Sequence, residues 1–127
     1  SHYDAYGIDI EPSFVAHAQS LGLKAEVADL LTYQSARRYD GIFACASLLH
    51  LPKKDFLPAI NHLRSLLEED GVLFVSMKLG EGERIDEKGR RMTYVSQADF
   101  ANLPLIDILL TKEEARGITW INALIKK

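Results

Sequence analysis

The sequence predicts an α/β fold in which a mostly parallel sheet ends in an antiparallel strand. Short apolar runs that suit buried strands alternate with segments whose apolar residues recur at helical spacing, and this alternation is typical of parallel sheets. The last two apolar runs, residues 106–110 and 119–125, are joined by a charged turn with no helix between them. We therefore expect these two runs to pair as an antiparallel hairpin.

The N-terminal segment predicts a strand, a helix and a second strand. Residues 6–10 have the pattern of a short buried strand, and Pro12 then lies where the first turn of a helix favours proline. Gly22 supplies the end of that helix, and residues 24–28 predict the second strand. The apolar residues at helical spacing are Phe14, Val15, Ala18 and Leu21.

The middle of the chain repeats this order. Residues 41–46 are small and apolar, as expected for a central parallel strand that is buried on both faces. Asp55 is positioned to cap the next helix, which residues 70–71 should end, and residues 72–77 predict the following strand. The apolar side of this helix consists of Leu57, Ile60, Leu63 and Leu67.

Two further segments precede the final hairpin. Residues 78–91 are charged and rich in glycine, which predicts a loop or a hairpin. Ser96 and Asp99 have the spacing of a capping box, so we expect a short helix from there to Leu103.

The bulk composition is that of one soluble domain. The chain has 127 residues, of which 47% are hydrophobic, and we expect a single domain over residues 1–127. No apolar run is long enough to cross a bilayer, so we expect no membrane partner. The net charge of −3, with scattered Lys and Arg, gives no support for a nucleic-acid partner. The single Cys45 cannot form an internal disulfide and no Cys/His cluster is present, so we expect no metal and a cytoplasmic location.

Acidic residues stand at the carboxyl ends of the first two predicted strands, where parallel α/β sheets bind ligands. Asp9 ends the first strand, and its two carboxylate oxygens suit the two hydroxyls of a ribose in an adenosine-containing cofactor. Asp29 follows the second strand and can accept a hydrogen bond from an adenine amine, with Ala28 and Leu30 as apolar walls.

Each candidate also has a purely structural interpretation. Asp9 can cap the helix that begins near Pro12, and Asp29 can start a turn. Cys45 has the features of a small core residue rather than a reactive thiolate. His50 is either a proton acceptor at a substrate pocket or, the interpretation we favour, a structural histidine bonded to the backbone.

Taken together, an ordered set of segments resembles the class I S-adenosylmethionine-dependent methyltransferase family. The segments are GIDIEP at 7–12, VADL at 27–30, YDGIFA at 39–44, LLHLP at 48–52, LL at 66–67 and DGVL at 70–73. They follow the family's order and approximate spacing along nearly the whole chain. The resemblance implies a Rossmann-like methyltransferase sheet, S-adenosylmethionine as cofactor and a small-molecule methyl acceptor.

The resemblance also implies roles for particular residues. Asp9 would bind the ribose hydroxyls and Asp29 the adenine amine, residues 44–46 would lie along the methionine arm, and His50 would face the acceptor. Because the sulfonium already carries an activated methyl group, the resemblance identifies no catalytic residue. The full set of expected cofactor contacts is Asp9, Ile10, Ala28, Asp29, Leu30, Ala44, Cys45 and Ala46.

One part of the family pattern has no counterpart in this sequence. The family's first strand and glycine-rich loop would precede Ser1, so we expect the N-terminal strand and helix to be missing from the sheet. In the family that strand lies between the strand ending at Asp9 and residues 41–46, and its loss would expose backbone groups on both. An upstream segment, a swapped strand or a homodimer partner would then fill the gap.

Three interpretations stay open at this point. The first is an enzyme, a small-molecule methyltransferase that is incomplete in this chain. The second is a non-enzymatic module with the same fold that self-associates through its open sheet edge. The third is a nicotinamide-dependent Rossmann protein, which fits less well because the antiparallel tail and the position of Asp29 match the methyltransferase pattern better.

Overall fold

The computed structural model describes residues 4–127, which divide into two compact units. The first unit extends to Ser35 and the second is Ala36–Lys127. The expectation of a single domain over the whole chain stays a prediction. Among the described residues, no helix has the length and apolar character needed to span a bilayer.

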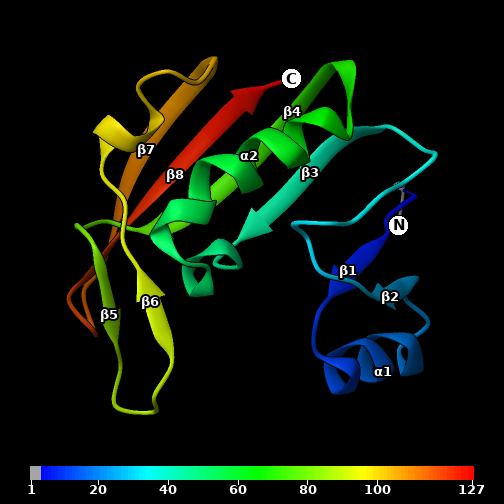
Figure 1. Cartoon of the computed structure of the whole chain (residues 1–127), viewed down its shortest axis with the longest axis horizontal. Helices are drawn as coiled ribbons and strands as arrows, with labels where there is room; N and C mark the ends of the chain where they lie inside the picture. The colour runs from blue at the N-terminus through cyan, green and yellow to red at the C-terminus, as the bar shows by residue number, and fades with distance from the viewer. Residues whose placement is uncertain (1–3) are drawn as a thin grey trace. The chain divides into compact units, whose positions relative to one another are not determined.

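The first unit contains the predicted strand, helix and strand. They are β1 (Gly7–Asp9), α1 (Pro12–Ser20) and β2 (Ala25–Val27), drawn in blue in Figure 1. β1 and β2 run parallel, with the Cα of Asp9 opposite that of Val27. Gly22 lies just after the helix at a φ of 82°, a conformation that favours glycine, so its predicted role as the stop is confirmed. The prediction that β1 is buried is wrong, because a two-stranded sheet covered by one short helix leaves most of its side chains in contact with solvent.

The second unit is built on a four-stranded sheet. Its strands are β3 (Tyr39–Cys45), β4 (Leu67–Lys78), β7 (Leu105–Glu113) and β8 (Ile118–Lys126). The order across the sheet is β3-β4-β8-β7, as Figure 1 shows. β3 and β4 are parallel, whereas β8 is antiparallel to both β4 and β7. The predicted α/β fold with an antiparallel C-terminal hairpin is therefore confirmed.

Helical turns and a small hairpin complete the second unit. α2 (Phe56–Ser65) runs across one face of the sheet in Figure 1. The charged segment after β4 forms the predicted hairpin. The other elements are η1 (Leu48–His50), η2 (Lys53–Asp55), β5 (Glu83–Ile85), β6 (Arg91–Thr93) and η3 (Gln97–Phe100).

The core of the second unit lies between α2 and the sheet. Because side chains alternate along a strand, every second residue of β4 and β8 points to this face. The buried residues on the two strands are Leu73, Val75, Met77, Ile121, Ala123 and Ile125. Those of the helical segments include Phe56, Ala59, Ile60, Leu63 and Phe100. This layer fixes the carboxyl ends of β3 and β4 relative to each other.

The structure corrects the prediction that residues 41–46 form a central strand. Among the described residues, β3 is at the edge of its sheet and pairs with β4 alone. Its Phe43 side chain is 73% exposed and stacks on Phe74 of β4, with ring centroids 4.8 Å apart. Apolar composition alone does not separate a central strand from an edge strand, because both carry β-branched and aromatic side chains.

Two helix ends and one cap differ from the prediction. α2 ends at Ser65, and Leu67 is already the first residue of β4, where it pairs with Tyr39. The next pair is Gly41 with Val72, so an irregularity in β4 accommodates the four residues between Leu67 and Val72. Asp55 precedes α2 but makes no side-chain cap hydrogen bond. The capping box of Ser96 and Asp99 is confirmed, although it begins a single 3-10 turn rather than a helix to Leu103.

Candidate functional site

Asp9 lies at the carboxyl end of β1, and one of its two carboxylate oxygens accepts a hydrogen bond within the protein. Its Oδ1 accepts a hydrogen bond from the Glu11 backbone N–H at 2.9 Å, which holds the side chain against the turn before α1. The cap of α1 is Glu11, whose side chain accepts from the Ser13 N–H at 3.2 Å, so Asp9 is not the helix cap. Oδ2 of Asp9 accepts no hydrogen bond from any residue that the structure describes, and the side chain is exposed.

Asp29 repeats this arrangement after β2. Its Oδ1 accepts from the Leu31 N–H at 2.9 Å, and its backbone carbonyl accepts from the Thr32 N–H at 3.1 Å. The interpretation that Asp29 starts a turn is therefore confirmed. The turn uses one carboxylate oxygen, so the other stays available to a ligand on the exposed side.

A backbone hydrogen bond joins the two strand ends. The Ala28 N–H donates to the Asp9 carbonyl at 3.0 Å, which continues the parallel pairing past the last paired residues. Ala28 and Leu30 are half-buried, whereas Ile10 is 68% exposed. The first unit thus presents two carboxylates together with three apolar side chains at one end of its sheet. A cavity of about 180 Å³ beside Asp9 is lined further by Gly7, Ile8, Phe14, Val15, Ala18 and Ala25.

The other predicted cofactor residues follow β3 in the second unit. Ala44 is buried, but Cys45 is exposed, so the interpretation of Cys45 as a core residue is wrong. The cause is the alternation of the strand, which turns Ala44 to the α2 side and Cys45 to the opposite face. The structure describes these residues and the two aspartates in separate units.

Ala46 adopts a backbone conformation that sequence reasoning missed. Its φ of 53° lies in the left-handed region, where it is the one non-glycine among the described residues. Such a conformation costs about 1–2 kcal/mol and persists only where neighbouring contacts hold it. Here the Ala46 N–H donates to the Ser76 carbonyl at 3.0 Å, so the chain turns sharply at the end of β3. In the sequence, the small side chain of Ala46 is the one feature that favours such a turn.

His50 lies on η1 and contacts the backbone of another segment. Its Nδ1 is 2.9 Å from the Arg91 carbonyl oxygen at the start of β6. Since a carbonyl only accepts, Nδ1 is the donor in this contact. The favoured interpretation, a histidine bonded to the backbone, is borne out. The expected role toward a substrate stays a prediction.

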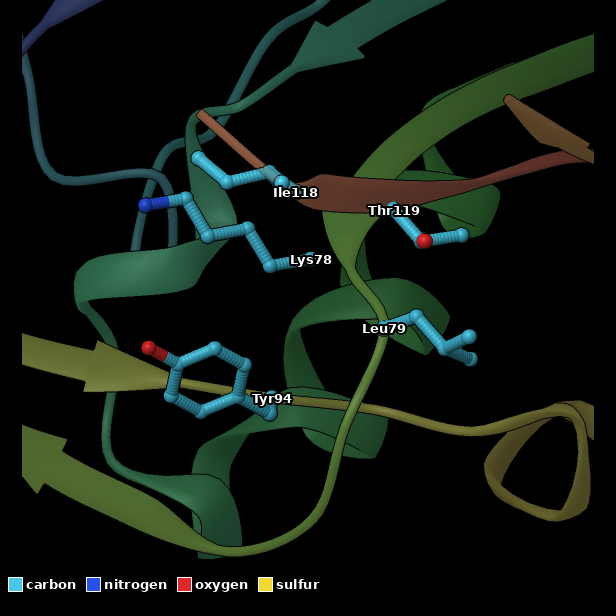
Figure 2. A pocket seen from close by; sticks show the side chains of 6 residues that line it. Lys78, Leu79, Tyr94, Ile118 and Thr119 are labelled. Carbon is cyan, nitrogen blue, oxygen red and sulfur yellow. The ribbon is translucent and has the colours of Figure 1, made fainter. Parts of the chain in front are cut away.

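A second cavity lies near the carboxyl end of β4. Its volume is about 360 Å³. The sequence did not predict that its lysine and its tyrosine belong to one site, because the lining residues come from three distant segments of the chain. Figure 2 shows this cavity from close by; its lining consists of Lys78, Leu79, Tyr94, Gly117, Ile118 and Thr119.

An ion pair supports the segment that carries Tyr94. The Lys53 ammonium donates to Asp99 Oδ2 at 3.0 Å and to the Tyr94 carbonyl at 2.5 Å. Partial burial opposes ionisation of Asp99, but the Ser96 backbone N–H and the Lys53 ammonium outweigh it and lower the pKa of this carboxyl. The carboxylate therefore stays charged and keeps the lysine in place. Among the residues described, no group of His, Cys, Asp or Glu side chains has the arrangement of a metal site.

Comparison with solved structures identifies the fold. The Burkholderia thailandensis 1,6-didemethyltoxoflavin-N1-methyltransferase, solved with its ligand and S-adenosylhomocysteine, superposes with a TM-score of 0.75 at 16% identity over 96% of this chain and 60% of its own. For the magnesium protoporphyrin IX methyltransferase of Synechocystis PCC 6803 with S-adenosylhomocysteine, the TM-score is 0.73 at 18% identity over 96% and 64%.

A third example is the N-methyltransferase NodS of Bradyrhizobium japonicum WM9 in complex with S-adenosylhomocysteine, with a TM-score of 0.72 at 15% identity over 96% of this chain and 65% of its own. The chain therefore spans less than two thirds of each of these proteins. No protein-family model matches the sequence, and no curated protein matches it significantly. The chain has the fold of the class I S-adenosylmethionine-dependent methyltransferases.

Proposed function

We propose that the protein containing this chain transfers a methyl group from S-adenosylmethionine to a small-molecule acceptor. The observation that carries the proposal is the methyltransferase fold together with an exposed carboxylate at the end of each of two adjacent parallel strands. Solved proteins with this fold hold S-adenosylhomocysteine. Ligands of parallel α/β sheets bind beyond the carboxyl ends of the strands, which is where both carboxylates stand.

The first unit has the chemistry that an adenosine group requires. Asp9 keeps Oδ2 for a ribose hydroxyl while Oδ1 is anchored by Glu11, so the carboxylate is held in place before a ligand arrives. Asp29 is anchored in the same way and offers its second oxygen to the adenine amine. Ala28, Leu30 and Ile10 supply the apolar surface on which a purine ring packs.

In the second unit, the proposal assigns the methionine arm to residues 44–46. The left-handed turn at Ala46 and its small side chain leave the backbone accessible after β3. When bound, the cofactor supplies a methyl group on a sulfonium, which a correctly aligned nucleophile attacks. His50 donates from Nδ1 to the Arg91 carbonyl, so Nε2 is the ring nitrogen that the proposal directs toward the acceptor.

The proposal predicts that Asp9→Ala weakens the binding of S-adenosylhomocysteine. We expect a loss of about 1.5–3 kcal/mol, the usual scale for hydrogen bonds to a charged group. The measurement is calorimetric titration of the protein, including any residues that precede Ser1 in its gene. Glu26→Ala is the matched control, because Glu26 is an exposed acid on the neighbouring β2.

Asp9→Asn separates the two functions of this side chain. The amide oxygen still accepts from Glu11, so the turn before α1 is kept, while the negative charge toward the ribose is lost. We expect an affinity between those of the wild type and Asp9→Ala. Equal affinity of the wild type and Asp9→Ala would remove Asp9 from the site, and a wild-type protein that does not bind S-adenosylhomocysteine would refute the proposed function.

As the alternative to this function, we propose a non-enzymatic module in which the chain forms a homodimer through the outer edge of β3. In the sheet as described, that edge has no pairing partner, and Phe43 beside it is 73% exposed. Unpaired edge strands readily add another strand. Light scattering after size exclusion should therefore give a dimer, and Phe43→Lys should shift it toward the monomer because a charge on the edge opposes pairing. A wild-type monomer at every concentration would contradict this interface.

A further inference from the structure

The cavity of about 360 Å³ near the end of β4 combines one basic group with a lining that is about half polar and half apolar. Figure 2 shows the side chains of Lys78, Ile118 and Tyr94 extending to the same side, with the lysine ammonium and the tyrosine hydroxyl at their outer ends. The apolar surface comes from Leu79, Ile118 and the tyrosine ring. The volume is near the lower end of the range for ligand pockets, about 300–1,000 Å³, which favours a small ligand.

The positive charge of Lys78 is not neutralised inside the protein. Among the described residues, no carboxylate lies within ion-pair distance of it. The ammonium lies 5.9 Å from the Trp120 ring centroid, and its charge is one of several influences, the Arg116 hydrogen bond first among them, that lower the pKa of Glu113. Glu113 is already occupied, since Arg116 binds both of its oxygens at 2.6 and 2.9 Å and Trp120 Nε1 donates to it at 3.1 Å.

Tyr94 is held rigidly on the other side of the cavity. Gly80 lies against its ring so closely that a Cβ there would come within 3.0 Å of it. The Arg84 guanidinium covers the ring at 5.2 Å, and Lys53 binds the carbonyl of the same residue. The hydroxyl forms no hydrogen bond within the part of the chain that the structure describes, so a donor of fixed position remains available.

We propose that this cavity binds a small molecule that carries a carboxylate on an apolar body, with the carboxylate between the Lys78 ammonium and the Tyr94 hydroxyl. A carboxylate accepts from both donors at once, and hydrogen bonds between charged groups are the stronger ones. A cationic ligand would place a second positive charge next to Lys78. A neutral ligand would leave the lysine charge unpaired.

This site adds a substrate class to the proposed function. The identification of the bound acid as the methyl acceptor rests on that function, whereas the binding of an acid does not. If the protein is a methyltransferase, the acid bound here is the methyl acceptor or carries the accepting group. The binding of an acid in this cavity needs no cofactor. The two ideas can therefore fail separately.

Phenylacetate is the probe that tests the cavity, with phenylacetamide and phenethylamine as its neutral and cationic counterparts. Titration without cofactor, followed by amide chemical shifts, should show saturable changes at Leu79, Gly117 and Thr119. We expect phenylacetate to bind about fivefold to tenfold more tightly than phenylacetamide. Phenethylamine should bind most weakly of the three.

Lys78→Met tests the charge while keeping an unbranched side chain against Trp120. It should lower phenylacetate affinity about fivefold or more and abolish the preference for the acid over the amide. Lys88→Met is the matched control, because Lys88 is exposed on the hairpin and lines no part of the cavity. The affinity of this variant for phenylacetate should stay within about twofold of that of the wild type. Tyr94→Phe keeps the ring under Arg84 and should cost about twofold to fivefold.

Several outcomes would overturn the proposal. These are equal binding of acid, amide and amine, unchanged affinity in a folded Lys78→Met, shifts that map to other segments, or no saturable binding of phenylacetate. If Lys78→Met does not fold, the relative affinities of the wild type for the acid, the amide and the amine still test the proposal. Acid binding in a protein that does not bind S-adenosylhomocysteine would keep the cavity assignment and refute its role in methyl transfer.

Discussion

Phe100→Ala is expected to lower the free energy of unfolding of the second unit by about 3–5 kcal/mol. Phe100 has no exposed surface, and its ring meets that of Phe56 edge to face, with centroids 5.5 Å apart. Truncation removes this aromatic contact and leaves a cavity between η3 and α2 that a close-packed core fills only in part. Since domains of this size are stable by about 5–15 kcal/mol, the loss is a large share of the total.

Urea unfolding followed by circular dichroism measures this effect. Leu109→Ala is the matched control, because Leu109 loses apolar atoms in the same way but is 62% exposed on β7. We expect the control to cost less than about 1 kcal/mol. A loss below about 1.5 kcal/mol for Phe100→Ala would show that η3 does not anchor the core as the structure indicates.

Gly71→Ala is expected to destabilise the second unit by about 3 kcal/mol, at the upper end for overpacking. A Cβ on Gly71 would lie 2.9 Å from the Glu68 carbonyl oxygen, 2.9 Å from the Leu67 Cβ and 3.0 Å from the Tyr39 carbonyl oxygen. Two of these atoms belong to the backbone, so no change of side-chain rotamer relieves the clash. The irregular pairing of β3 with β4 at this point would have to open.

Gly41→Ala is the control for this substitution, since Gly41 pairs with Val72, next to Gly71 in the same strand pair. A Cβ there would meet only the Val72 carbonyl oxygen, at 3.9 Å, which is an ordinary contact. We expect its free energy of unfolding to stay within about 1 kcal/mol of the wild type. Equal thermal stability of Gly71→Ala and the wild type would contradict the close approach at β4.

The elements were predictable where local chemistry decides them. Pro12 and Gly22 bound α1 because proline suits the first turn and glycine accepts a positive φ. The side chains of Ser96 and Asp99 each accept a hydrogen bond from the other residue's backbone N–H, so their separation of three residues is enough to predict the capping box. Such signals act over one turn and do not depend on the rest of the molecule.

The candidate site was predictable in part for a related reason. Asp9 and Asp29 stand at the ends of strands whose pattern is visible, so their placement on adjacent parallel strands followed from the order of elements. The turn at Asp29 was an open alternative until its hydrogen bond was seen. Asp9 was expected to cap α1 if it was structural, and instead it accepts a hydrogen bond in the turn before that helix. The residues of the larger cavity had no shared signal, because Lys78, Tyr94 and Ile118 meet only through the pairing of distant segments.

The sequence was sufficient to predict the α/β fold, the limits that proline and glycine set to α1, the antiparallel C-terminal hairpin and the acids that end the first two strands. The exposure of Cys45 and the departure of Leu67 from its helix to pair with Tyr39 became clear only in the folded structure. The physical reason is that propensity and capping act between neighbours in the chain. Burial and strand pairing depend instead on which distant segments come together.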